Sequence, residues 1–226
     1  MLVAVLDSAT PAVTAALAEV TARGVLVRAE RTTVDARAHG ELLAPQLDDV
    51  LREAGAKPRD LAAIVAGTGP GPFTGLRVGL VTAAALGDAL GIPTYGVCSL
   101  DALGWAAAAA SDEVTLVATD ARRREIYWAV YHGGGARLTD PAVHRPADVV
   151  PLIAGLNMRR AVGEGAIVYA DVLGLPVAEP RYPPAAALAE LAEARVRQNA
   201  PGERLTPLYL RRPDAVLPGS PKRVTP

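Results

Sequence analysis

The chain has 226 residues, half of them apolar, and a formal net charge of -1 at pH 7. This length suits one large domain or two small ones, and the near-neutral charge excludes a general attraction to nucleic acid or anionic membranes. The single cysteine, Cys98, cannot form an internal disulfide, which predicts a reducing, cytoplasmic location. The apolar start lacks the basic flank of a signal peptide. No apolar run of about 18 residues is free of charge and proline, so we expect no membrane span.

The first part of the chain predicts a sheet that is extended by strand–helix units. A buried strand comes first, and two β-rich runs follow it as a hairpin. The expected elements are three strands, a helix, a strand, a helix and a strand, over residues 2–6, 13–20, 25–33, 38–54, 61–66, 75–90 and 94–97. Pro45 interrupts the first helix, which therefore kinks there or begins near Leu42. A hairpin sheet covered by helices indicates an α/β fold.

The second part starts with an Ala-rich helix, a plausible crossing between domains, and continues with another hairpin. Its expected elements are a helix, two strands, a helix, a strand and a helix, over residues 100–110, 114–119, 125–132, 146–155, 161–166 and 185–198. We therefore expect two lobes, 1–103 and 104–213. The composition of residues 214–226 predicts a flexible tail.

A glycine–proline loop, residues 67–75, joins a predicted strand to a predicted helix. It lacks the lysine of a P-loop and the glycine spacing of a dinucleotide-binding loop, so both phosphate motifs are rejected. The loop residues Gly69, Gly71 and Phe73 remain candidates for binding an anion, because free N–H groups at a helix N-terminus attract anions.

The start of this helix carries its own signals. We expect Thr74 to cap it, and Phe73 and Val78 to pair as a hydrophobic staple. Arg77 lies in the first turn, where the helix dipole disfavours a cation. It is either a surface arginine that extends into solvent or one with an anion or carboxylate partner.

Small residues recur every four positions along the same helix, at Gly75, Gly79, Ala83 and Gly87. Each glycine lowers helix propensity by about 1 kcal/mol, so the stripe suggests close approach by another backbone. That backbone belongs either to a partner or, in ordinary helix–sheet packing, to the same fold.

No metal or nucleophile site can be assembled from the sequence. The histidines, His39, His132 and His144, have no metal-site spacing, and only one cysteine is available. Ser8 and Ser99 lack a histidine nearby in sequence to activate them.

Two groups of charged residues leave alternatives open. Asp7 and Asp120 each end a strand near the start of a half, where a carboxylate either holds a magnesium–nucleotide or, more commonly, caps a turn. The run Arg122 to Arg124 could meet RNA phosphates or be simply solvated. The absence of interleaved aromatic residues weakens the RNA interpretation.

The segment from Gly69 to Gly79, GPGPFTGLRVG, closely resembles the G-P-G-S-F-T-G-L-R-[IV]-G signature of the bacterial TsaB family. Weaker family patterns follow the expected order within residues 1–213: Leu6-Asp7-Ser8-Ala9-Thr10, His39 with Leu42-Leu43, Asp120-Ala121-Arg122 with Glu125-Ile126-Tyr127, Gly163-Glu164-Gly165-Ala166, and Tyr209-Leu210-Arg211. Pro72 replaces the usual Ser, which removes an N–H and a hydroxyl from the loop. Ser8-Ala9 replaces the usual Thr-Ser, which weakens any catalytic role for the first turn.

The resemblance implies a duplicated actin-like (ASKHA) fold with two lobes, each a mixed sheet with helices. It implies a non-catalytic subunit that supports TsaD in forming N6-threonylcarbamoyladenosine beside the tRNA anticodon. TsaD carries a metal-binding H-x-x-x-H, whereas Leu43 stands four residues after His39 here, so no metal site is expected. The alternative is a phosphotransferase of the same fold that uses Asp7 and Asp120 with Mg-ATP.

The resemblance also implies partners. These are a TsaD-like protein, a TsaE-like ATPase and, when the chain is alone, a second copy of itself; tRNA is reached only through the complex. No cofactor of its own is expected, although a nucleotide could bind at the TsaD interface. The expected partner interface lies on the helices after the third and fourth strands, at His39, Leu43, Leu47, Thr74, Gly75, Arg77, Val78, Gly79 and Ala83.

Overall fold

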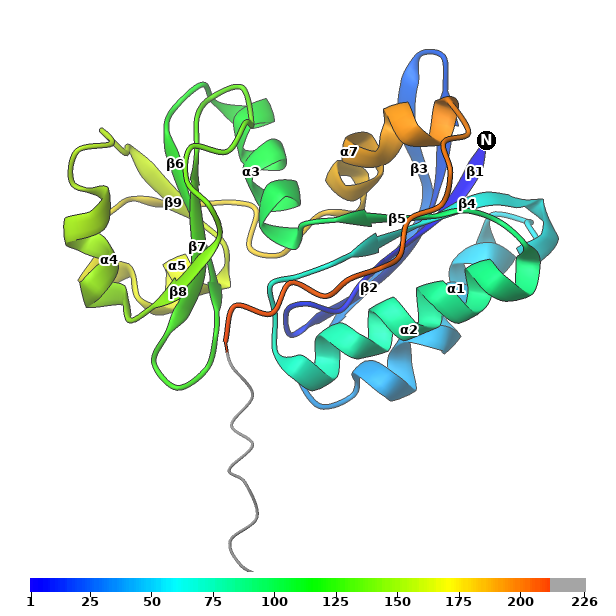
Figure 1. Cartoon of the computed structure of the whole chain (residues 1–226), viewed down its shortest axis with the longest axis horizontal. Coiled ribbons are helices and arrows are strands. Elements are labelled where there is room, and N and C mark those ends of the chain that lie inside the picture. The colour runs from blue at the N-terminus through cyan, green and yellow to red at the C-terminus, as the bar shows by residue number, and fades with distance from the viewer. Residues whose placement is uncertain (212–226) are drawn as a thin grey trace, which may run out of the picture.

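A computed structural model describes residues 1–211 and shows two lobes, each built on a five-stranded mixed sheet (Figure 1). The first sheet contains β1 (Leu2–Asp7), β2 (Ala12–Thr21), β3 (Gly24–Val34), β4 (Leu61–Gly67) and β5 (Thr94–Val97). Their order is β3-β2-β1-β4-β5. The hairpin strands pair antiparallel, whereas β1, β4 and β5 are parallel.

The second sheet repeats this topology. It contains β6 (Thr115–Asp120), β7 (Ile126–Tyr131), β8 (Ala142–His144), β9 (Arg160–Val162) and β10 (Val177–Ala178), in the order β8-β7-β6-β9-β10. Again the first three strands pair antiparallel, and the last two join in parallel. The matching order and directions confirm the expected duplicated, actin-like α/β fold.

Helices cover both faces of the first sheet. One face packs against α1 (His39–Glu53) and α2 (Phe73–Leu90), and the other against α7 (Ala185–Arg197) (Figure 1). α1 begins at His39 and includes Pro45, so the alternative start near Leu42 is wrong. The segment Pro58–Asp60 forms a 3-10 turn before β4.

α3 (Ser99–Ala110) lies between the two sheets. Leu100, Leu103 and Ala107 join the core of the second sheet, whereas Ala102 joins the core between the first sheet and α7. At Gly104 a Cβ would lie 2.4 Å from the ring of Tyr131, which explains why this position has no side chain. The expected crossing between lobes is therefore confirmed.

The expected boundary between the lobes needs a correction. α7 packs on the first sheet, since Ala185, Leu188 and Val196 share a core with its strands. The range 104–213 had placed residues 185–211 in the second lobe. In the structure they return to the first lobe. Without α7, the apolar side chains on that face of the first sheet would be exposed to solvent. The order of elements along the chain does not show which sheet α7 covers. The expected tail over 214–226 lies outside the described residues.

The second lobe is completed by α4 (Pro146–Ile153), α5 (Glu164–Val168) and α6 (Ala170–Leu173). The strand expected over 161–166 ends earlier, at Val162. Gly163 has φ +99°, and a Cβ there would lie 2.2 Å from the carbonyl oxygen of Ala118, so the chain turns into α5 at a point where only glycine fits.

After α7 the chain forms a strap, residues 199–211, without regular secondary structure. It passes from α7 along the first lobe toward the second (Figure 1). Backbone hydrogen bonds hold it there: the Glu203 N–H donates to Thr94 O over 2.8 Å, and the Leu208 N–H donates to Thr68 O over 2.8 Å. The strap therefore joins the edge of the first sheet to the region between the lobes.

Within residues 1–211, α2 is the one helix with the length and composition to cross a membrane. It carries Arg77 and Asp88, and its buried residues form part of the core against the first sheet. Packing within the lobe accounts for the apolar residues on its buried face, whereas others, such as Val81, are exposed.

Candidate functional site

The loop before α2 starts the helix earlier than expected. α2 begins at Phe73 with Pro72 as its N-cap, and no side chain caps it. The prediction that Thr74 caps the helix is therefore wrong. Since Phe73 is itself the first helical residue, the staple with Val78 is wrong as well.

The loop is pressed against the end of β1. A Cβ on Gly71 would lie 2.3 Å from the carbonyl oxygen of Ala9, and one on Gly67 would lie 1.7 Å from Asp7 Oδ2. Gly69 has φ +89° and accepts a hydrogen bond from the Ser99 N–H through its carbonyl. These glycines are needed for close packing inside the protein, so no phosphate role is required to explain them.

Asp7 is buried below this loop. The Ser99 hydroxyl donates to its Oδ2 over 2.6 Å, and the Ala9 N–H donates to its Oδ1 over 3.0 Å. Burial raises the pKa of Asp7 to about 6, against the lowering effect of these hydrogen bonds. The carboxyl group ties together the ends of β1, β4 and the start of α3.

Asp120 occupies the equivalent strand end of the second lobe and serves its own turn. The Arg122 N–H donates to its Oδ1 over 3.0 Å. Neither Asp7 nor Asp120 lines the two cavities beside the loop. The commoner role, a carboxylate that caps a turn, describes Asp120.

The small-residue stripe on α2 faces the interior of the first lobe. The Ser8 hydroxyl joins it to β1, donating to Gly75 O over 2.8 Å and accepting from the Gly79 N–H over 2.9 Å. A Cβ on Gly79 would lie 2.5 Å from Ser8 Oγ, and one on Gly87 would lie 2.5 Å from a methyl carbon of Thr94. The backbone that approaches the stripe thus belongs to the same fold.

This placement corrects part of the expected partner interface. Gly75, Gly79 and Ala83 on α2 are buried in the lobe. The same holds on α1 for His39, Leu43 and Leu47, and the His39 Nε2–H donates to Thr10 O over 2.8 Å. These six residues are buried in the packing of the lobe, although His39 and Gly75 also line a cavity beside the loop. The remaining expected residues, Thr74, Arg77 and Val78, are exposed or half-buried.

Arg77 has partners within the chain, and they are aromatic. Its guanidinium carbon lies 3.6 Å from the ring centroid of Phe73, and its Nε–H donates to the Tyr209 hydroxyl over 2.7 Å. The rings of Phe73 and Tyr209 stack with centroids 5.2 Å apart. Arg77 is exposed, as the surface alternative predicts, but its partners are aromatic and not a carboxylate or another anion. The cation–π contact and the hydrogen bond fasten the strap to α2.

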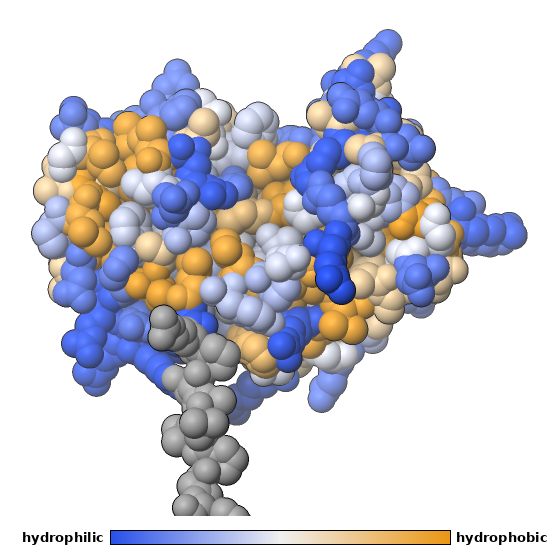
Figure 2. Space-filling model, in the orientation of Figure 1, coloured by the Kyte–Doolittle hydropathy of each residue, from blue (hydrophilic) through white to orange (hydrophobic). Residues whose placement is uncertain are grey.

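The outer face of α2 is exposed and mixes apolar with polar residues. Its exposed positions include the apolar Phe73, Val81, Ala84 and Ala85 and the polar Thr74, Arg77 and Asp88, and Val81 is 65% exposed. A groove of about 380 Å³ lies beside it, between α2 and the strap. Figure 2 shows hydrophobic side chains among polar ones on the flank where α2 lies in Figure 1.

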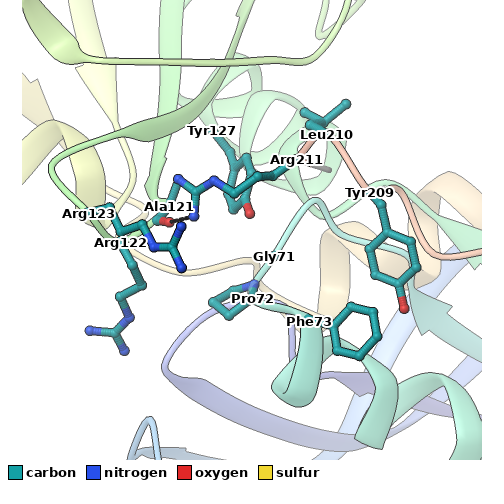
Figure 3. Close-up of a pocket in the computed structure, with 10 residues that line it drawn as sticks. All are labelled: Gly71, Pro72, Phe73, Ala121, Arg122, Arg123, Tyr127, Tyr209, Leu210 and Arg211. Atoms are coloured by element: carbon teal, nitrogen blue, oxygen red, sulfur yellow. Dashed lines mark hydrogen bonds between the residues drawn. The ribbon is translucent and has the colours of Figure 1, made fainter. Parts of the chain in front are cut away.

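A second cavity, of about 380 Å³, opens between the lobes. It is lined by Gly71, Pro72, Phe73, Ala121, Arg122, Arg123, Tyr127, Tyr209, Leu210 and Arg211 (Figure 3). The first lobe supplies the loop and α2, the second supplies the turn after β6, and the strap closes the gap. Arg211 joins the lobes by donating to Ala121 O over 3.1 Å and by pairing with Glu125.

Sequence reasoning missed Tyr209 and Arg211 as site residues. Their only signal was a weak terminal Y-L-R pattern, since neither contact is local in sequence. Ser8 and Ser99 were considered only as nucleophiles, although both are buried and position α2 and Asp7. In residues 1–211 no three side chains of His, Cys, Asp or Glu cluster as a metal site.

Fold and site together define a two-lobed, actin-like α/β protein whose glycine–proline loop packs tightly against the end of β1. A family model described as TsaD: tRNA N6-adenosine threonylcarbamoyltransferase matches residues 27–201. A protein of Mycobacterium tuberculosis H37Rv is 50% identical over 210 residues, 93% of this chain and 92% of that protein. The Escherichia coli tRNA threonylcarbamoyladenosine biosynthesis protein TsaB is 35% identical over 96 residues, 42% of each chain.

Solved structures give the same result. YeaZ from Pseudomonas aeruginosa superposes with a TM-score of 0.75 at 29% identity, covering 92% of this chain and 99% of that chain. The ethanolamine utilization protein EutJ from Carboxydothermus hydrogenoformans, with a TM-score of 0.51 at 12% identity, shares the fold alone. The chain belongs to the family of the matching model and is a TsaB-like member of it.

Proposed function

We propose that this chain is a non-catalytic subunit that supports a TsaD-like transferase in tRNA threonylcarbamoyladenosine biosynthesis. Its TsaB relatives are named for this biosynthesis, and the matching family is named for the transferase, which supports the proposal. The observation that carries the proposal is the sealed end of the first sheet. There the loop glycines and Ser99 enclose Asp7, where a phosphotransferase of this fold would need an open carboxylate.

We propose the outer face of α2 as the surface that pairs with the TsaD-like protein. It combines the exposed Val81 with Ala84 and Ala85 and with the groove beside the strap, whereas Phe73 at the start of α2 lines the cavity between the lobes. Small and apolar residues on one exposed helix face suit helix–helix packing at an interface. When the partner is absent, a second copy of the chain would pair through the same face. We also propose that a nucleotide can bind at the interface with the TsaD-like protein.

The pairing surface is tested by Val81→Arg. Val81 is 65% exposed, so a guanidinium there disturbs no core of the isolated chain. Buried in an interface, the same charge would be desolvated, and we expect pairing to weaken by about 10-fold or more. Isothermal titration of the TsaD-like protein measures the effect.

The matched control is Val168→Arg, at a 57% exposed valine on α5 of the second lobe. Equal affinity of the Val81→Arg and wild-type chains for the partner would refute this surface. Gly79→Leu is unsuited to the purpose, because it would overpack the lobe against Ser8.

The function itself is tested by reconstitution. The TsaD-like protein, a TsaE-like ATPase, threonylcarbamoyl-adenylate and tRNA are combined with and without this chain. We expect modified tRNA to form in repeated turnover only when the chain is present. Full turnover without it would contradict the proposed role, and turnover by the chain alone would show that it is an enzyme.

A further inference from the structure

The cavity between the lobes brings together two kinds of side chain that lie far apart in the sequence. Arg122 and Arg123 come from the turn after β6, and Phe73 and Tyr209 come from α2 and the strap. Figure 3 shows the arginine side chains and the aromatic rings on opposite sides of Pro72. The sequence objection to RNA binding, that no aromatic residue accompanies the arginine run, is thus removed by the tertiary structure.

The arginine turn is held in an unusual backbone conformation. Arg122, Arg123 and Arg124 have φ angles of 62°, 55° and 63°, the left-handed region that residues other than glycine seldom adopt. All three residues are exposed. The Arg122 guanidinium lies 3.7 Å from the Asp120 carboxylate, which is longer than a hydrogen bond, so it can donate to another anion.

The aromatic side offers ring surface to a flat partner. Phe73 is 48% exposed and Tyr209 is 39% exposed, although the two rings stack on one another. Arg77 and the strap hold the pair in place. Exposed rings beside guanidinium groups are the features on which proteins stack unpaired bases while binding the adjoining phosphates.

The size and charge of the cavity narrow the ligand further. A volume of about 380 Å³ is at the small end of ligand pockets and suits one nucleotide rather than a duplex. The whole chain has a net charge of -1, so an attraction for phosphate at this site has to come from the arginines that line it. The carboxylates of Asp120 and Glu125 offset part of their charge. Binding through it would be weak for the chain alone and would add to contacts made elsewhere in a complex.

We propose that this arginine–aromatic cavity binds one unstacked nucleotide of the RNA on which the complex acts, with the phosphate at Arg122 and the base against Phe73 and Tyr209. The inference rests on the proposed function, since the RNA is the tRNA substrate of the assembled complex. It gives this subunit a direct contact with RNA in addition to its support of the partner.

The test measures the affinity of the assembled complex with the TsaD-like partner for fluorescently labelled tRNA, by anisotropy between 50 and 300 mM salt. In Arg122→Gln, we expect the slope of log affinity against log salt to become shallower by about 0.7, because one phosphate is no longer neutralised. In Phe73→Leu, which keeps an apolar side chain, we expect affinity to fall about fivefold or more with the slope unchanged. Size-exclusion chromatography of each variant with the partner checks that the complex stays intact.

The matched control is Arg59→Gln. Arg59 is an exposed arginine before β4, at the end of that strand opposite the loop and about 20 Å from it. We expect this variant to bind tRNA like the wild type. Equal affinity and slope in all variants would overturn the proposal. Weaker tRNA binding that is explained entirely by dissociation of the complex would overturn it as well.

The outcome also separates this inference from the proposed function. If the wild-type complex modifies tRNA but the variants bind RNA normally, the cavity has no RNA role and the proposed function stands. If the wild-type chain neither pairs nor supports modification, the proposed function fails. RNA titrated into the chain alone then decides: weaker binding by Arg122→Gln supports the cavity, and binding equal to that of the wild type overturns it.

Discussion

The buried carboxyl group of Asp7 makes the stability of this protein depend on pH in a defined direction. Burial raises the pKa of Asp7 from its ordinary 3.8 to about 6. The folded protein therefore binds this proton more tightly than the unfolded chain does. A raised pKa contributes stability that is fully present below about pH 3.8 and is lost as pH rises through 6.

The size of the effect follows from the shift. One unit of pKa corresponds to about 1.4 kcal/mol, so a shift of about two units changes the free energy of unfolding by roughly 2 to 3 kcal/mol in total. Most of this change, about 2 kcal/mol, falls between pH 4 and pH 7. A change of this size is large beside the total stability of a typical domain.

The substitution Asp7→Asn isolates this contribution because asparagine does not titrate. Urea unfolding of both proteins, followed by circular dichroism at pH 4, 5, 6 and 7, gives the free energy of unfolding of each. We expect the wild-type value minus the Asp7→Asn value to fall by about 2 kcal/mol across this range. Titrating groups that do not interact with Asp7 contribute equally to both proteins and cancel, whereas His39, whose charge acts on the Asp7 carboxyl group, does not cancel fully.

A second substitution checks the cause. The Ser99 hydroxyl donates to Asp7 Oδ2 and lowers the pKa of that carboxyl group. In Ser99→Ala the pKa of Asp7 should rise further, so the loss of stability should move to higher pH. A difference between wild type and Asp7→Asn that is flat with pH, or that rises with it, would refute the reasoning. It would mean that the hydrogen bonds outweigh burial.

Two further predictions concern glycine and cysteine positions. Gly79→Ala places a Cβ 2.5 Å from Ser8 Oγ and should lower the free energy of unfolding by about 1–3 kcal/mol. Gly40→Ala, in α1, has no atom within 4 Å of its Cβ and should raise the free energy of unfolding by up to about 1 kcal/mol. Urea unfolding compares the two variants, and an equal effect of both would contradict the packing at Gly79. Burial, followed by the charge of Asp101, raises the pKa of Cys98 to about 11, so its thiol should react with Ellman's reagent at pH 8 far more slowly in the native protein than in urea. Rapid reaction of the native protein would show that the thiol is accessible and ionised.

Much of the fold could be predicted because it depends on local patterns. The hairpin of β2 and β3, the strand β5 and the apolar faces of α1 and α2 follow from periodicity and turn residues. The start of α2 at Phe73 could not be predicted from local patterns. Its N-cap is Pro72, and the Phe73 ring stacks on Tyr209, which lies far away in the sequence. Strand β9 ended early for a similar reason: the Ala118 carbonyl, distant in sequence, leaves room only for Gly163.

By itself, the sequence determined the α/β class, the repeated hairpin-first halves and, through the segment from Gly69 to Gly79, the family. Only the tertiary structure decided what the conspicuous residues do. It turned the glycine stripe of α2 inward onto Ser8, sealed Asp7 behind Gly67, and returned α7 to the first sheet. These outcomes depend on contacts between residues far apart in the chain, and spacing along one segment carries no information about which backbone will approach it.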